Sequence, residues 1–376
     1  MKKIAVIPLL YDEINYGGVL QFYALQKILK QQEYEVNILQ VNNETFVIPR
    51  KEIHSLSFKG RIARMLFYPK RKKNERILKY ALEDRKAKVK QFKAKHYSNV
   101  VDLSYADLKS YDAFICGSDQ IWNPTYARQR HFLAFAPDDS NKIIYAASLG
   151  TESITEKQAA YMKPYIDGIR HVSVREHSGK KLLDSFCQRN DIEVVLDPTL
   201  LLTKDEWCSI LPREQRRTND YVFTYFLGSV SEETKNTIRD YARKNELRVI
   251  NVAFASGEKV DLDFFGDVNL KNLGPEEFLS YIKEARAVFT DSFHACVFSI
   301  LFNTVFYVFE RKTTTNMNGR IHTLHQNFHI ESRFVTATHP IDEIAEQIDF
   351  SRIAEYQNTL RQKSIDFLLE SIQNEE

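Results

Sequence analysis

The first forty residues combine short apolar runs with a helical pattern. One apolar run covers Lys3–Leu10 and a second covers Glu35–Val41. Between them, over Val19–Gln31, apolar residues recur at helical spacing. The residues with this spacing are Leu20, Ala24, Leu25, Ile28 and Leu29. Strand, helix and strand in this order are typical of a βαβ unit, so the pattern predicts a parallel sheet with a right-handed crossover.

The same alternation continues along the chain. Further strands are predicted at Ala113–Cys116, Lys142–Ala147, His171–Val174, Val194–Leu196, Tyr221–Leu227, Arg248–Val252, Ala287–Thr290 and Val305–Phe309. Helices are predicted at Glu156–Tyr165, near Gly179–Gln188, and at Glu232–Asn245, Pro275–Glu284, Phe293–Leu301 and Ile341–Ile372. The polar stretch Pro212–Asp220 has no strong period and marks a linker between two domains.

These elements predict an α/β protein with two Rossmann-like, doubly wound parallel-sheet domains. A chain of 376 residues suits two domains better than one. The N-terminal domain is placed at residues 1–212, with a helical insertion at about 59–95, and the C-terminal domain at 213–340. Residues 341–376 are expected to form a helix that packs back on the first domain. Such folds leave loops free at the carboxyl ends of their strands, so a ligand cleft is expected between the two sheets.

Composition favours a cytoplasmic protein. Lys2 and Lys3 precede an apolar run, but the run is short and contains Pro8, and no small-residue cleavage site follows. A first strand is therefore expected instead of a signal peptide. No apolar stretch approaches the roughly 20 residues of a spanning helix. The four cysteines form no Cys-x-x-Cys pair, which fits a reducing compartment and argues against disulfides and a thiolate metal site.

The stretch 59–95 is strongly basic, with fifteen Lys and Arg residues against Glu75, Glu83 and Asp84. Two interpretations stay open. The stretch is either a solvated helical insertion or a surface for peripheral contact with anionic lipid at the inner membrane face, where each basic residue contributes ~1 kcal/mol. Nucleic acid is not expected as a partner, because the net charge is only +2 and aromatic residues are not interleaved at stacking spacing.

The first predicted strand is followed by Asn15, Tyr16, Gly17 and Gly18. Adjacent glycines allow a ligand to approach the backbone closely, and a helix start offers unpaired N–H groups to an anion. The segment lacks both the G-x-G-x-x-G and the Walker lysine patterns, so it is not a dinucleotide or P-loop fingerprint. A tight turn without a ligand is the alternative.

A second loop follows the strand Ala113–Cys116. Its candidate ligand-binding residues are Ser118, Asp119, Gln120, Trp122 and Asn123. A carboxylate that accepts hydroxyl hydrogen bonds, together with an aromatic face, suits a sugar platform. Capping of the next helix by Ser118 or Asp119 explains the same residues equally well.

Two further strand ends carry an arginine and a histidine. Arg175 ends a strand, and its planar fork suits a carboxylate or a phosphate. The alternative is a surface pair with Glu176, but neighbours on an extended strand point to opposite faces. His294 falls in the first turn of a helix that Asp291 or Ser292 caps. The helix dipole disfavours a charged imidazole there and a bound phosphate favours it, so His294 is a candidate general acid.

Arg311 and Arg320 lie beyond the last predicted strand, with Thr313–Asn316 between them. They suit contacts to an anion or a sugar, or they belong to an ordinary surface loop. The sequence has no H-E-x-x-H, G-x-S-x-G or EF-hand spacing, so no metal site is expected, although participation of a divalent ion is left open. Asp197, which precedes Pro198 at a strand end, is interpreted as a turn residue.

Taken together, these loops resemble the polysaccharide pyruvyl transferase family from about residue 4 to about residue 325. The segments that carry the resemblance are Asn15–Gly18 with Leu20 and Gln21, Gly117–Asn123, Tyr145–Ser148, Val174–Glu176, Leu196–Leu200 and Thr290–His294. The resemblance implies a glycosyltransferase-B-like pair of domains. It also implies transfer of a pyruvyl group from phosphoenolpyruvate to a sugar, as a ketal, in exopolysaccharide, capsule or cell-wall assembly. No bound cofactor is expected.

The resemblance also implies roles for single residues. Arg175 would hold the carboxylate or phosphate of the donor, and His294 would be the catalytic acid. Some branches of the family have an arginine two residues before that histidine, where this chain has Ser292. Arg311 or Arg320 would then replace the missing contact. The reaction itself also needs a base or an orienting carboxylate for a hydroxyl of the sugar or lipid-linked oligosaccharide acceptor, and Asp119 is the candidate for this role.

Two other functions stay open at this point. One is a glycosyltransferase of the same architecture that uses a nucleotide sugar. It would need an acidic residue for the ribose, for which Glu276, Glu277 and Glu310 are candidates without diagnostic spacing. The other is a non-catalytic, glycan-binding member of a polysaccharide-assembly complex.

Overall fold

The structure is a computed structural model. It describes residues 1–9, 14–41, 45–49, 68–212, 219–252, 255–256, 259–260, 264–311 and 318–373. Most of the predicted linker, the start of the basic stretch and Thr313–Asn316 therefore lie outside the described residues.

Seven parallel strands form the N-terminal sheet in the order β3-β2-β1-β4-β5-β6-β7. Their bounds are β1 Lys3–Ile7, β2 Glu35–Gln40, β3 Asn99–Asp102, β4 Ala113–Asp119, β5 Lys142–Ala147, β6 His171–Val174 and β7 Glu193–Val194. The strand order reverses between β1 and β4, where Ile4 pairs with Ala113 and Ile7 with Cys116. The edge strand β3 was not predicted, because it is short, begins and ends with a polar residue, and is partly exposed.

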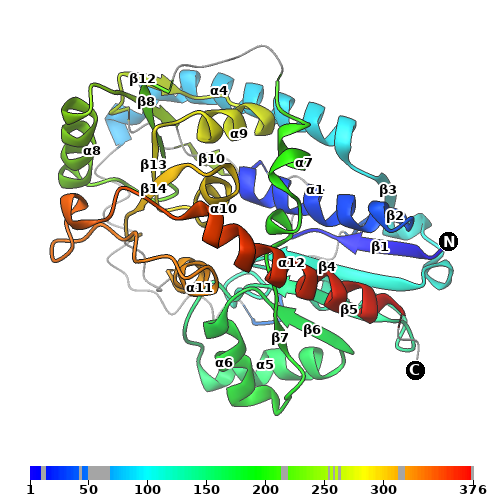
Figure 1. The fold of residues 1–376 in the computed structure, drawn as a ribbon. Helices are drawn as coiled ribbons and strands as arrows, with labels where there is room; N and C mark the ends of the chain where they lie inside the picture. The colour runs from blue at the N-terminus through cyan, green and yellow to red at the C-terminus, as the bar shows by residue number, and fades with distance from the viewer. Residues whose placement is uncertain are drawn as a thin grey trace.

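Five parallel strands form the C-terminal sheet in the order β12-β9-β8-β13-β14. Their bounds are β8 Tyr221–Tyr225, β9 Arg248–Val252, β12 Val268–Leu270, β13 Ala287–Thr290 and β14 Val305–Val308, and a separate antiparallel pair consists of β10 Ala255–Ser256 and β11 Lys259–Val260. The order here reverses between β8 and β13, where Thr290 pairs with Tyr225. Two parallel sheets with interleaved helices confirm the predicted fold class (Figure 1).

Helices cover the faces of both sheets (Figure 1). The α-helices are α1 Tyr16–Gln31, α4 Tyr68–His96, α5 Glu156–Asp167, α6 His177–Cys187, α7 Lys204–Cys208, α8 Glu232–Lys244, α9 Pro275–Lys283, α10 Phe293–Phe302, α11 Gly319–Asn327 and α12 Phe350–Gln373. The 3-10 helices are η1 Leu103–Tyr105, η2 Leu108–Ser110, η3 Gln129–Phe132, η4 Pro198–Leu200 and η5 Ile341–Glu343.

One apolar cluster joins the two domains. It contains residues of α1 and of the N-terminal strands together with residues of β8, α9 and α10. Tyr16 at the start of α1 stacks on Phe278 of α9 with ring centroids 4.2 Å apart. The ring centroid of Tyr225 of β8 lies 5.6 Å from that of Tyr16. The two sheets therefore share buried apolar surface, and the loops at their ends are held against each other by packing.

The chain was predicted to be helical throughout Ile341–Ile372, and this prediction is wrong in its first part. Only the single 3-10 turn η5 forms there, and α12 begins at Phe350. Asp349 accepts a hydrogen bond from the Arg352 backbone N–H at 3.0 Å, which is how a helix start is capped.

The terminal helix α12 crosses to the N-terminal sheet (Figure 1). The Leu196 N–H donates to Ser364 Oγ at 2.9 Å, and Asn141 Nδ2 donates to the Ser371 carbonyl at 2.7 Å. Lys2 Nζ donates to the Ile372 carbonyl at 3.1 Å, so the first and last described segments lie side by side. In this way α12 supports the stretch that leads from β7 into η4.

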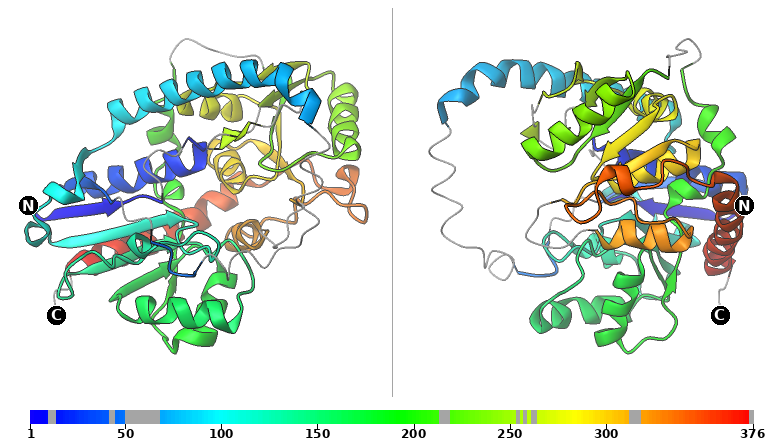
Figure 2. Two further views of the ribbon diagram at one scale, coloured as in Figure 1. Left: turned by 180° about the vertical axis from the view of Figure 1, so that it is seen from behind. Right: turned by 60° about the vertical axis from the view of Figure 1, so that its left-hand side comes forward.

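The described part of the basic stretch is the long helix α4, which runs along α9 of the other domain (Figure 2). Lys88 pairs with Glu277 at 2.8 Å and Lys95 with Glu276 at 3.4 Å. Arg85 is fully buried, with its guanidinium carbon 4.7 Å from the centre of the Tyr16 ring. Some basic residues of α4 therefore form ion pairs between the two domains.

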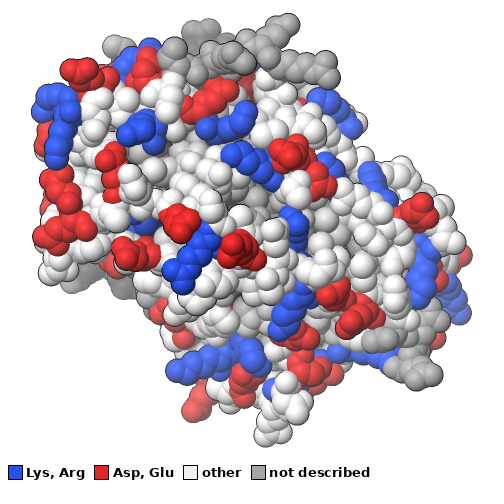
Figure 3. All heavy atoms as spheres, viewed as in Figure 1, with Lys and Arg blue, Asp and Glu red and all other residues white. Residues whose placement is uncertain are grey.

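Both signs of charge are interspersed over the face of the molecule shown in Figure 3. No helix within the described residues combines the length and the apolar character that crossing a membrane requires.

Candidate active site

The candidate residues gather where both sheets reverse their strand order. In the N-terminal sheet the segment that follows β1 contains Asn15–Gly18, and β4 ends with Ser118 and Asp119. In the C-terminal sheet the segment that follows β13 contains Asp291–His294. Ligands of open parallel sheets bind at such reversal points, because the loops diverge there and leave room between them. The predicted location of the site thus follows from the strand order.

Asp197 lies at the centre of these contacts. Its Oδ2 accepts hydrogen bonds from Arg175 Nη1 at 2.6 Å and Ser118 Oγ at 3.2 Å. Its Oδ1 accepts from the backbone N–H of Thr199 at 3.0 Å and from Thr199 Oγ1 at 2.7 Å. The carboxylate is completely buried, and it caps η4. The sequence predicted a turn here, and this part is confirmed, but the side chain also faces the site.

Asp197 stays ionised despite its burial. Burial raises the pKa of Asp197, but the charges of His294 and Arg175 and the hydrogen bond from Thr199 outweigh that effect and hold the pKa well below its usual range. A buried negative charge therefore lies beside His294 and Arg175.

Arg175 is buried among carboxylates. Besides its bond to Asp197, its Nη2 donates to Asp119 Oδ1 at 3.4 Å, and its guanidinium lies 4.5 Å from the centre of the Phe293 ring. The expectation that Arg175 and Glu176 point apart is wrong, since Nε lies 3.8 Å from Glu176 Oε2. The strand β6 ends at Val174 and Glu176 is the N-cap residue of α6, so strand alternation no longer applies. A bound anion would have to compete with these carboxylates for Arg175.

His294 lies in the first turn of α10, and Ser292 caps this helix by accepting from the Ala295 N–H at 3.5 Å. The imidazole Nε2 is 3.6 Å from Asp197 Oδ2, across the domain boundary. A Cβ atom at Gly17 would overlap the His294 ring at Nδ1. Gly17 was predicted to admit a ligand to the backbone, but its missing side chain makes room for this histidine.

Asp291 organises the loop beside His294. Its two carboxylate oxygens accept from the N–H groups of Leu227 at 2.7 Å and Gly228 at 2.9 Å. Arg311 Nε donates to Asp291 Oδ2 at 3.0 Å. Arg311, predicted as a substrate contact, therefore links the ends of β13 and β14.

Arg320 of α11 is buried close to two other arginines. Burial and the charges of Arg175 and Arg311 lower the pKa of Arg320 to about 10, and the carboxylates of Glu176 and Asp119 offset only part of this. Repulsion between like charges is relieved when an anion binds among them. An anion bound here would relieve the repulsion among Arg175, Arg311 and Arg320.

The second predicted loop is divided between the site and the core. Asp119 has a left-handed backbone with φ of 68°, and its side chain is 15% exposed and faces Arg175. Gln120 Oε1 accepts from Asn123 Nδ2 at 3.0 Å, so these two side chains hold the loop together. Trp122 is fully buried and stacks on Phe132, with its Nε1 donating to the His131 carbonyl. The predicted aromatic sugar platform is therefore absent at Trp122.

The first predicted loop starts α1. Asn15 caps the helix and accepts from the Gly17 N–H at 3.0 Å. The Tyr16 hydroxyl donates to the Leu273 carbonyl at 2.9 Å, and burial raises its pKa to about 12. Tyr16 and Gly18 are both buried in the helix. The segment is therefore a helix start packed against the other domain and not an isolated turn, and an anion at this helix start stays a prediction.

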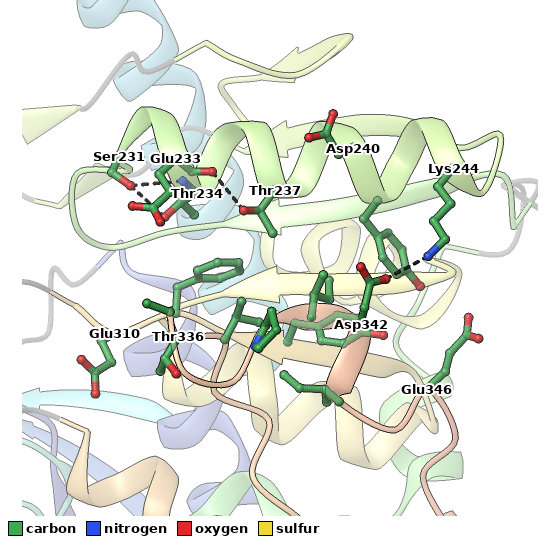
Figure 4. Close-up of a pocket in the computed structure, with 18 of the residues that line it drawn as sticks. Ser231, Glu233, Thr234, Thr237, Asp240, Lys244, Glu310, Thr336, Asp342 and Glu346 are labelled. Carbon is green, nitrogen blue, oxygen red and sulfur yellow. Dashed lines mark hydrogen bonds and ion pairs between the residues drawn. The ribbon is translucent and has the colours of Figure 1, made fainter.

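A cavity of about 910 Å³ lies elsewhere in the C-terminal domain, between α8 and the segment 335–346 (Figure 4). Its lining contains Glu233, Asp240, Glu310, Asp342 and Glu346 against a single lysine, Lys244. Lys244 is paired with Asp342 at 2.9 Å. An acidic lining of this kind disfavours an anionic donor.

The residues that sequence reasoning missed are Asp197 as a site residue and Glu176 as a buried one. Glu176 Oε1 accepts from Ser148 Oγ at 2.8 Å and from the Leu149 N–H at 3.1 Å. An acidic residue within three residues of a strand end was visible in the sequence in both cases, but only the fold shows which of them lies beside His294. Within the described residues, no group of three or more His, Cys, Asp or Glu side chains is arranged to hold a metal ion.

Comparison with known proteins is consistent with this geometry. The model of the family described as polysaccharide pyruvyl transferase matches residues 15–313. No curated protein matches the chain. The structure of UGT89C1 from Arabidopsis thaliana in complex with UDP is 10% identical and covers 99% of this chain and 100% of that chain, with a TM-score of 0.51. UDP-GlcNAc 2-epimerase from Neisseria meningitidis, bound to UDP-GlcNAc, is 9% identical with coverage of 99% and 100% and a TM-score of 0.50. Both show the fold alone, which is the predicted glycosyltransferase-B-like arrangement.

Proposed function

Because this chain belongs to the polysaccharide pyruvyl transferase family, a family of transferases, we propose that it moves a pyruvyl group from phosphoenolpyruvate to a sugar. The acceptor is a sugar of a surface polysaccharide or of its lipid-linked precursor, and the product is a ketal. The observation that carries the proposal is the position of His294 beside Asp197 of the other domain, at the end of both sheets where Arg320 and Asp119 also lie. An acid, a cation and a partly exposed carboxylate are the groups that this reaction needs.

The proposed reaction proceeds by proton transfer and two additions. His294 protonates the methylene carbon of phosphoenolpyruvate, which makes C2 electrophilic. A sugar hydroxyl adds to C2, phosphate leaves with the electrons of the C2–O bond, and a second hydroxyl closes the ketal. Of the two protons lost by the hydroxyls, one restores His294 and the other leaves with phosphate. A positioned acid of this kind contributes about 10²–10⁴-fold to the rate.

Arg320 is proposed to hold the phosphate or the carboxylate of the donor. Replacing Arg320 with alanine is expected to lower kcat/KM for phosphoenolpyruvate by about 10²–10³-fold, the usual effect of removing one preorganised electrostatic donor. Arg320→Lys keeps the charge without the planar fork and should recover part of the loss. The measurement is steady-state kinetics at varied donor concentration. An unchanged kcat/KM in Arg320→Ala would assign the donor to other residues.

Isotope transfer tests the function itself. Purified protein is incubated with an acceptor glycan and either carbon-labelled phosphoenolpyruvate or labelled nucleotide sugars, and label in the glycan is measured. Label from phosphoenolpyruvate, with release of inorganic phosphate, is the expected result. Label from a nucleotide sugar alone would establish a glycosyltransferase. Calorimetry that shows glycan binding without phosphoenolpyruvate binding would indicate a non-catalytic protein.

Glu276 and Glu277 were candidates for a ribose contact in a nucleotide-sugar enzyme. Both form ion pairs with lysines of α4.

We also infer peripheral contact with anionic lipid through α4, whose Lys86 and Lys90 are exposed. The double reversal Lys86→Glu/Lys90→Glu is expected to weaken sedimentation with anionic vesicles at low salt by more than about tenfold, at ~1 kcal/mol per basic residue. The matched control is Lys109→Glu/Lys181→Glu, which changes the net charge equally at exposed positions outside α4. If neither the wild-type protein nor the control variant binds anionic vesicles, the proposed contact of α4 with anionic lipid does not exist.

A further inference from the structure

The two ring nitrogens of His294 have different surroundings. Nε2 is buried, lies 3.6 Å from Asp197 Oδ2, and makes no hydrogen bond to any described residue. Nδ1 lies on the opposite side of the ring, next to the Gly17 backbone in the first turn of α1. One nitrogen therefore faces a buried negative charge, while the other lies beside the start of α1 in the N-terminal domain.

The Asp197 carboxylate cannot easily turn away from the ring. Its Oδ1 is held by both donors of Thr199. Its Oδ2 is held by Arg175 and Ser118, and this same oxygen is the one nearest Nε2. A fixed and ionised carboxylate beside one nitrogen of an imidazole determines which nitrogen carries the proton and how the ring is oriented.

We propose that Asp197 is a positioning residue that keeps a proton on Nε2 of His294, so that Nδ1 is the nitrogen that exchanges a proton with the substrate. The inference rests on the proposed function, because it assigns an atom to the acid of that reaction. In the protonated ring both nitrogens carry hydrogen. Nδ1–H gives its proton to the methylene carbon of phosphoenolpyruvate, and the neutral ring keeps the proton that faces Asp197. A proton from the attacking hydroxyl then restores Nδ1–H.

The distance of 3.6 Å between His294 Nε2 and Asp197 Oδ2 is compatible with Asp197 as a positioning residue. Hydrogen bonds of catalytic groups are often long in the unliganded state and shorten when the substrate binds. The Gly17 backbone lies against the His294 ring, so packing restricts how far the ring can turn.

The test is Asp197→Asn, which keeps the shape of the side chain and removes its charge. We expect kcat to fall by about 10²-fold or more, as when the orienting carboxylate of a catalytic histidine is replaced by an amide. KM for phosphoenolpyruvate should change by less than about threefold, because an interaction that acts in the transition state affects kcat. A residue that only supported the fold would lower the amount of active protein and leave the kcat of the folded fraction unchanged.

The second readout is nitrogen-15 NMR of the histidine rings, with the His294 signals assigned by comparison with His294→Gln. In the wild-type protein the neutral ring is expected to carry its hydrogen on Nε2, and in Asp197→Asn this preference should be lost. If the variant shows the same tautomer and near-normal kcat, the proposal is overturned. If wild-type protein transfers no label from phosphoenolpyruvate, the proposed function fails while the NMR result still decides the role of Asp197.

Thr199→Val covers the case in which Asp197→Asn does not fold. It removes the Oγ1 donor to Asp197 and keeps the charge, so a smaller loss of kcat, several-fold, is expected together with a mixed tautomer. An unchanged tautomer and kcat in Thr199→Val would count against the proposal. Thr224→Val is the control. Thr224 Oγ1 is buried in the C-terminal sheet and bonded to Asn251 at 2.8 Å, so its loss affects stability and not the ring.

Discussion

Replacing His294 with alanine is expected to lower pyruvyl transfer by about 10²–10⁴-fold, the contribution of one positioned general acid. The fold should persist, because α10 is capped by Ser292 and not by the histidine. Transfer of labelled pyruvyl groups to the acceptor measures the effect, and circular dichroism with urea unfolding measures the fold.

His322→Ala is the matched control for His294→Ala. His322 is an exposed histidine of the same domain, on α11, and its ring stacks on Phe334. This control should retain normal transfer. A His294→Ala protein with near-wild-type turnover would remove His294 from the mechanism and leave Asp119 as the remaining titratable candidate.

Replacing Arg175 with methionine is expected to lower the free energy of unfolding by ~3–5 kcal/mol, since it leaves buried carboxylates without their cation. Its side chain is 1% exposed, and that of Asp197 is 0% exposed. Urea unfolding at neutral pH is the measurement. Arg248→Met removes an ion pair with Asp220 in which both side chains are about half exposed, and it should cost less than ~1 kcal/mol. Equal costs for the two variants would show that the buried network contributes little.

The double variant Arg175→Met/Asp197→Leu separates the cost of an unpaired charge from the value of the pair. Replacing both members of a buried ion pair by apolar residues is often close to neutral. Part of the lost stability should therefore return in the double variant, and the difference from the sum of the single variants gives the coupling. If the second substitution instead adds its own full cost, the negative charge of Asp197 is not what destabilises Arg175→Met.

The stability of the single variant Arg175→Met is also expected to depend on pH. In the wild-type protein the pKa of Asp197 is lower in the folded state than in the unfolded state. Its contribution to stability is therefore present above the unfolded pKa, ~3.9, and is lost as the pH falls through the folded pKa. Without Arg175 one of the effects that lower this pKa is gone and burial still raises it. The stability difference between Arg175→Met and wild type should therefore be constant near neutral pH and narrow as the pH falls through the folded-state pKa of Asp197 in the variant, which is higher than in the wild type.

Much of the fold could be predicted because its strands are parallel and covered on both sides. The strands β5, β9 and β13 agree with the predicted ranges residue for residue. Such strands are nearly continuous apolar runs, so their pattern is strong. The edge strands β3 and β12 were missed because they are short and half exposed. The start of α1 was placed too late, because Gly17 and Gly18 do not look helical until the cap of Asn15 and the packing of His294 against Gly17 are known.

The sequence by itself determined the two sheets and the loops that meet at their carboxyl ends, and it singled out His294 at the start of a helix. These are local properties, because hydrophobic spacing and helix caps depend on neighbours within a few residues. Only the tertiary structure decided that Asp197 lies beside His294, that Arg175 is bound by three carboxylates, and that Trp122 belongs to the core. The reason is physical: each of these contacts or burials depends on how elements from separate parts of the chain pack, and packing between distant elements leaves no periodic trace in the sequence.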